Sequence, residues 1–205
     1  MNEKLRFNPD VWYQSLALIA REAPAQRYKG LVNLHRITLK DYVGALNQMT
    51  EDQAEAPGVD GRKRKIVIAH TMGWEEWQTQ VFADPQKGER LKKQLHMEGY
   101  QDPETGNRID FSSVGAFNAH QEELYRDWSW NDIREKALAT ANRLHSFFPD
   151  DPTGEWLQFL DSEPIKEWHV TKDITLTVPG AWYLWMVSLE HEAVEHRKDL
   201  MIDSV

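Results

Sequence analysis

The feature that most constrains this chain is an apolar stripe near its C-terminus. Seven residues recur there at steps of three and four, the spacing of one face of an α-helix. They are Val178, Trp182, Trp185, Leu189, Glu192, His196 and Leu200. A face this apolar must pack against a core, yet Glu192 and His196 interrupt it. A buried carboxylate without a partner is costly, so we expect these two side chains to meet a further charged group. A metal ion is the simplest such group.

A histidine far upstream completes a candidate metal site. His70 lies on the apolar face of a helix expected over residues 62–83. Residues four apart on an α-helix lie about 40° apart around its axis, so Glu192 and His196 share a face. If the two helices face each other, His70, Glu192 and His196 converge on one point. Two imidazoles and one carboxylate leave coordination positions open, which is typical of a catalytic metal site. The alternative is that His70 is a core histidine and that Glu192 pairs with an arginine.

The expected ion is divalent, with zinc preferred and nickel, iron or manganese as alternatives. Nitrogen and oxygen ligands suit all of these ions, and the Irving–Williams order does not choose among them without the geometry. His191 is expected at the rim of the pocket. On a regular α-helix His191 and His196 lie about 140° apart, so they should not bind one ion together. His191 could instead pair with Glu195, four residues on, or act as a proton shuttle. The further pocket candidates are Trp74, Trp77, Trp185, His35 and His120.

Four long amphipathic segments predict an all-α protein. They span about residues 30–49, 62–83, 114–148 and 179–200, and the third is expected to break where Ser129 can cap a new helix. Shorter helices are expected over Asp10–Arg21 and over residues 85–98, and a short β-like patch over residues 174–178. Four such helices with no sustained strand pattern favour a four-helix bundle with long connections. We expect it to span residues 29–205, after an N-terminal helical extension over residues 1–28.

Composition excludes several classes of function. The chain has no cysteine, which rules out a disulfide framework, a thiolate metal site and a cysteine nucleophile. The net charge is −9, with acidic and basic residues interleaved, so nucleic acid is not an expected partner. No apolar run reaches the roughly 20 residues of a membrane span, and no signal-peptide core is evident. We therefore expect a cytoplasmic protein whose partner is a small-molecule substrate.

Three stretches resemble a known family. The stretch Ile66–Trp74, reading IVIAHTMGW, resembles the second-helix motif of the DinB-like (damage-inducible) superfamily of helical bundles. Glu192–Leu200, reading EAVEHRKDL, resembles the fourth-helix motif. Residues 110–118, followed by WSWNDI at residues 128–133, are similar to the start of the third helix in the branch that includes mycothiol-dependent maleylpyruvate isomerase. The resemblance covers residues 30–202.

The resemblance implies a four-helix bundle that holds a metal through one ligand from the second helix and two from the fourth. It also implies a possible homodimer and, in several members, a low-molecular-weight thiol as cofactor. The predicted function is therefore a metal-dependent enzyme, a transferase or isomerase in which the metal activates a thiol. The alternatives are a metal-dependent hydrolase and a non-catalytic bundle that binds an apolar ligand or a partner chain. The long connections depart from compact members of the family and leave the substrate open.

Overall fold

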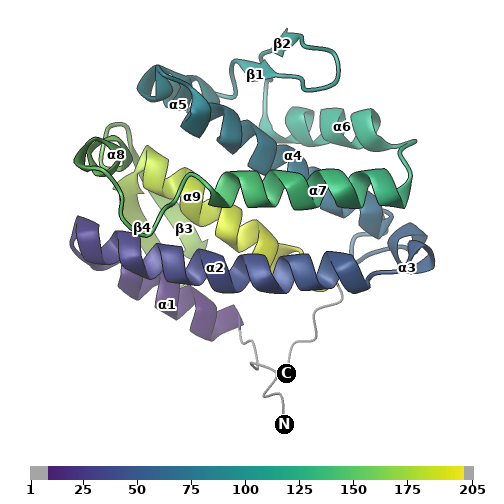
Figure 1. Ribbon diagram of the computed structural model, residues 1–205, viewed down its shortest axis with the longest axis horizontal. Helices are drawn as coiled ribbons and strands as arrows, with labels where there is room; N and C mark the ends of the chain where they lie inside the picture. The colour runs from purple at the N-terminus through teal and green to yellow at the C-terminus, as the bar shows by residue number, and fades with distance from the viewer. Residues whose placement is uncertain (1–8, 201–205) are drawn as a thin grey trace.

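The structure, a computed structural model, describes residues 9–200 and is predominantly helical, as predicted (Figure 1). Its longer helices are α2 (Pro24–Gln48), α4 (Arg64–Ala83), α7 (Trp130–His145) and α9 (Gly180–Glu190), the last continued by a π-helical turn, η1 (His191–Glu195). The shorter ones are α1 (Pro9–Arg21), α3 (Glu51–Glu55), α5 (Lys87–Leu95), α6 (Val114–Tyr125) and α8 (Gly154–Leu160). In this described part, no helix is both long and apolar enough to cross a membrane.

The four longer helices pack against one another. Helix α7 contacts both α2 and α4, and α9 also contacts both of these helices. Figure 1 shows α2 and α7 running alongside each other, with α9 crossing behind them. Two large apolar clusters fill most of the interior, and a third, small one consists of Trp77, Tyr100 and Phe117. One of the large clusters is built around Trp182, Trp185 and Leu189 of α9, and the other lies between α2, α4 and α7, with Tyr42 and Ile133 among its members.

Local sequence signals explain where these helices begin. Ser129 caps α7 by accepting a hydrogen bond from the backbone N–H of Asp132 at 3.2 Å, so the predicted break in the third segment is confirmed. Ser113 caps α6 in the same way, through the N–H of Ala116 at 3.1 Å. Helix α2 begins at Pro24, earlier than predicted, because a proline is well tolerated in the first turn of a helix.

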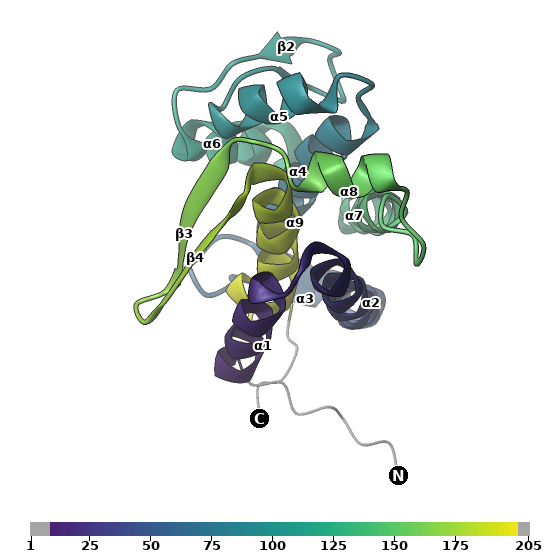
Figure 2. The ribbon, with the colours of Figure 1, turned by 90° about the vertical axis from the view of Figure 1, so that its left-hand side faces the viewer.

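Two antiparallel hairpins accompany the helices, although the sequence shows no sustained strand pattern. Strands β1 (Tyr100–Gln101) and β2 (Arg108–Ile109) form a short one. Strands β3 (Ile165–Thr171) and β4 (Ile174–Pro179) form a longer one that packs against α9 and α1 (Figure 2). The β-like patch at residues 174–178 is confirmed. Its partner β3 was missed because most of its residues are at least partly exposed and polar, which hides the apolar alternation of a strand.

Candidate metal centre

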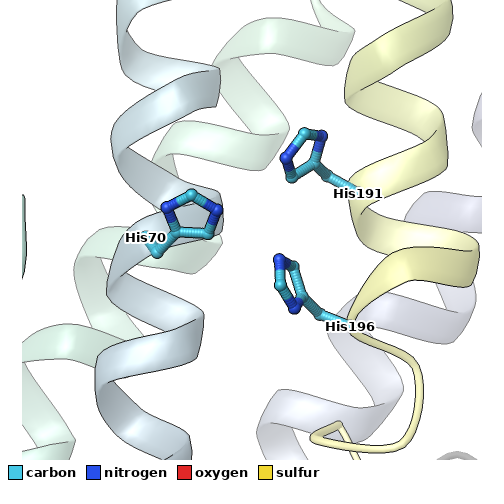
Figure 3. A group of neighbouring side chains, drawn as sticks. All are labelled: His70, His191 and His196. Atoms are coloured by element: carbon cyan, nitrogen blue, oxygen red, sulfur yellow. The ribbon is translucent and has the colours of Figure 1, made fainter. Parts of the chain in front are cut away.

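Three histidines meet at the junction of α4 and the C-terminal turn. One ring nitrogen each of His70, His191 and His196 lies within 4.8 Å of the other two (Figure 3). His70 comes from α4 and is only 5% exposed, whereas the other two are partly buried and come from η1 and the residue that follows it. Figure 3 shows the three rings turned toward a common space between the two segments. The arrangement offers three nitrogen ligands to one ion.

A π-helical turn explains why His191 belongs to this group. The sequence analysis placed His191 and His196 on different faces, and that interpretation assumed a regular α-helix. Residues His191–Glu195 form a π-helix instead, in which hydrogen bonds span five residues rather than four. The wider turn brings residues five apart onto nearly the same face. The centroids of the His191 and His196 rings are consequently 5.7 Å apart, and the His70 ring lies 5.2 Å from that of His196.

The nitrogens of this group are available as ligands. Nδ1 of His191 lies 3.0 Å from the backbone oxygen of Val187, which can only accept, so Nδ1 carries the proton and Nε2 keeps its lone pair. Such a bond fixes the tautomer and the orientation of a metal-binding imidazole. Nδ1 of His70 and Nε2 of His196 are buried and have no hydrogen-bond partner within residues 9–200. Buried polar atoms normally have hydrogen-bond partners or ligands, and a metal ion bound between the rings would interact with nitrogens of this kind.

Burial favours the neutral form of two of these histidines, His70 and His196. Burial, with a smaller effect of the neighbouring His191 and His196, which disfavour a second positive charge, lowers the pKa of His70 to about 3. The pKa of His196 is also lowered, chiefly by burial. Neutral imidazole is the form that binds a metal, so these two rings need not lose a proton near neutral pH before they coordinate an ion.

Glu192 lies elsewhere. Its side chain, 1% exposed, faces the equally buried Glu75 of α4. Tyr42 of α2 lies close enough for both carboxyl groups to act on it electrostatically. Burial raises the pKa of Glu192 to about 7 and the pKa of Glu75 well above its usual value. The predicted convergence of His70, Glu192 and His196 is therefore corrected: the structure brings His191 into the group in place of Glu192. Among the described residues, no ion pair between Glu192 and an arginine is seen either, and the group that Glu192 faces is the carboxyl group of Glu75.

A cavity of about 210 Å³ opens beside the histidines. It is lined by His70, Trp74, Gln78, Val114, Asn118, Tyr183, Leu184, Val187, His191 and Glu195. The structure thus places the predicted pocket residues Trp74 and His191 in its wall. Glu195 forms part of the same wall, and its Oε2 lies 3.3 Å from Nε2 of His191. These two atoms pair only when Nε2 carries a proton, whereas a metal ion would take the lone pair of that nitrogen, so the pairing considered for His191 and metal binding through Nε2 are alternatives. A larger hollow, of about 420 Å³, lies between α5 and α8 and has no histidine in its lining.

The other predicted pocket residues do not line this cavity. Trp77 and Trp185 are fully buried in the apolar clusters. His35 is a core histidine that accepts a hydrogen bond from the indole N–H of Trp185 at 3.2 Å. His120 lies 3.1 Å from the buried carboxylate of Asp102, beside the short hairpin.

Comparison of this chain with protein-family models, with curated proteins and with solved structures found no match.

Proposed function

We propose that the protein is a metal-dependent enzyme acting on a small molecule, with one divalent ion bound by His70, His191 and His196. The observation that carries this proposal is the approach of three imidazole nitrogens within 4.8 Å of one another, beside a cavity that two of the rings line. Three imidazole ligands with an adjacent opening are typical of catalytic zinc sites. Zinc is the preferred ion, with nickel, iron and manganese as alternatives.

Each residue has a separate part in this proposal. His70 supplies a ligand from α4, while the π-helical turn and the residue that follows it supply His191 and His196. The carbonyl of Val187 orients the His191 ring. Leu184 and Val187 line the cavity with apolar surface and limit the access of water. A bound divalent ion would stabilise a deprotonated thiol or water as nucleophile, or polarise a substrate oxygen.

The more specific proposal, a thiol-dependent transferase or isomerase, rests on the resemblance to DinB-like proteins. In that proposal α2, α4, α7 and α9 are the four helices of the bundle, and the cytoplasm is the site of action. Adding a low-molecular-weight thiol to the cobalt-loaded protein should produce a thiolate-to-cobalt charge-transfer band. Cobalt-loaded protein that shows no such band with any thiol would favour the hydrolase, in which the metal activates water.

Elemental analysis of protein purified without a histidine tag tests the metal site. The protein should contain one divalent ion per chain. His70→Ala, His191→Ala and His196→Ala should each lose the ion. His169→Ala, on the exposed face of the long hairpin, is the matched control and should keep full occupancy.

Glu192→Gln separates the structure's ligand set from the one that the sequence predicted. It should retain the ion, because Glu192 faces Glu75 and not the histidines. Loss of the ion in Glu192→Gln together with full occupancy in His191→Ala would restore the original set. Wild-type protein without any bound divalent ion, even after incubation with zinc, would refute the metal site and favour a non-catalytic binding bundle.

A further inference from the structure

The cavity beside the histidines has two amide side chains and no cationic one in its lining. Its other wall residues are apolar or aromatic, apart from the two histidines and Glu195. At about 210 Å³ the cavity is below the roughly 300–1,000 Å³ of pockets that hold drug-sized ligands. Its occupant must therefore be small, with an apolar body and few polar groups.

Trp74 fixes the orientation of one of the two amides. Its indole Nε1 lies 3.1 Å from Oδ1 of Asn118. An indole N–H can only donate, so the carbonyl half of Asn118 must face Trp74 and the Nδ2 amino group must face away from it. Trp74 is itself held by aromatic contacts with Phe117, at 4.4 Å between ring centroids, and with Trp77, at 5.7 Å. The wall therefore presents an oriented hydrogen-bond donor beside a fixed flat ring.

Gln78 adds a buried amide with an unused hydrogen-bonding group. It is 1% exposed, and its Nε2 has no partner among the described residues, while its Oε1 contacts the Ser188 hydroxyl. That hydroxyl has one proton, and it also lies 3.0 Å from the backbone oxygen of Leu184. Whichever way the Gln78 amide is turned, either its oxygen or its NH2 group bonds to Ser188, and the other group has no partner among the described residues. A polar group left unpaired in a buried wall costs about 1–3 kcal/mol, which a ligand's polar group can recover.

The charge of the wall disfavours an anion. The carboxylate of Glu195 lies beside His191, and no lysine or arginine lines the cavity to balance a second negative charge. The wall itself offers an anionic ligand no cationic side chain, so such a ligand would be drawn to the metal, where it would occupy the position that the reaction needs.

We infer that this cavity selects a small uncharged molecule with a flat apolar body and a carbonyl-type oxygen, which accepts a hydrogen bond from Nδ2 of Asn118. The inference names the substrate class of the proposed enzyme and so rests on the proposed function for its role. Binding itself depends on side chains of the wall, not on the ion, so it can be measured in metal-free protein.

Three molecules of nearly the same shape test the inference: benzoate, benzamide and benzamidine, which are anionic, neutral and cationic. Each is titrated into chelator-treated protein and followed by NMR. Benzamide should bind roughly tenfold or more tightly than benzoate. Equal affinities for the two, or no shift of cavity resonances with any of the three, would overturn the inference.

Asn118→Asp is the decisive variant. A carboxylate still accepts the Trp74 N–H but cannot donate to the ligand, so the change keeps the Trp74 contact and inverts only the recognising group. Benzamide affinity should fall about tenfold, as expected for one lost hydrogen bond, and benzamidine should become the preferred ligand. Asn107→Asp adds the same charge on an exposed turn outside the cavity and should leave the preference unchanged. An unaltered benzamide-to-benzamidine ratio in Asn118→Asp would refute the role of Asn118.

Metal content, measured on the same preparations before chelation, decides the proposed function separately. Benzamide selectivity in a protein that never binds an ion would leave the cavity assignment standing and remove the enzyme. A stoichiometric ion with no selectivity would do the reverse.

Discussion

Glu192→Gln should make the metal-free protein more stable, by an amount that grows with pH. Burial beside Glu75 raises the pKa of Glu192 to about 7 in the folded protein, from the 4.5 of an unperturbed glutamate. The folded state therefore binds this proton more tightly than the unfolded state does. The stability that the group contributes is fully present below pH 4.5 and is lost as the pH rises through about 7.

The magnitude follows from the difference between the two pKa values. A pKa that rises from 4.5 to about 7, at roughly 1.36 kcal/mol for each pH unit, corresponds to about 3 kcal/mol. Glutamine has nearly the same shape and cannot ionise, so it avoids this loss. The free energy of unfolding of Glu192→Gln should match that of the wild type near about pH 4 and exceed it by about 3 kcal/mol near about pH 8.

Urea unfolding, followed by circular dichroism in the presence of a chelator at a series of pH values, measures this difference. The buried histidines His35 and His70 have lowered pKa values, so they contribute stability that rises with pH, but that effect is common to both proteins and cancels. Glu98→Gln, at an exposed position, is the control and should show no pH-dependent gain. A difference between Glu192→Gln and the wild type that is flat from acid to alkaline pH would refute the buried carboxyl pair.

Three further predictions concern the ligands and the helices. Because the pKa values of His70 and His196 are lowered, zinc affinity should fall by no more than about tenfold per pH unit between neutral pH and about pH 5, which is the slope expected when one proton competes with the metal. A steeper fall in a competition titration would mean that several ligands take up protons in this range. Gly73→Ala should destabilise the protein by about 1–3 kcal/mol in urea unfolding, because the added methyl group would lie 2.3 Å from Oε1 of the buried Gln121. An unchanged unfolding midpoint would contradict this close approach of α4 and α6. Ser129→Ala should cost about 1 kcal/mol through the lost cap of α7, visible as a lower melting temperature, whereas a melting temperature equal to that of the wild type would show that the cap contributes little.

Local patterns in the sequence determined most of the helical framework. Apolar residues at steps of three and four mark α2, α4 and α9, because this spacing puts them on one face of a helix that must be buried. Ser129 marks the start of α7, because a serine side chain can satisfy a backbone N–H that the helix leaves free. The same reasoning found His70 and His196, since each is a polar residue on an otherwise apolar face.

Tertiary structure decided the third histidine and the fate of Glu192. The angle between His191 and His196 depends on whether the turn is α- or π-helical, and apolar spacing in the sequence does not distinguish the two. Glu192 remains on the buried face, as its spacing indicated, but a spacing pattern does not show which side chain lies opposite. That partner is Glu75, which is supplied by a different helix more than a hundred residues earlier in the chain. A sequence pattern describes one face of one helix, whereas a site between helices also depends on their rotation and register, which only the packed core determines.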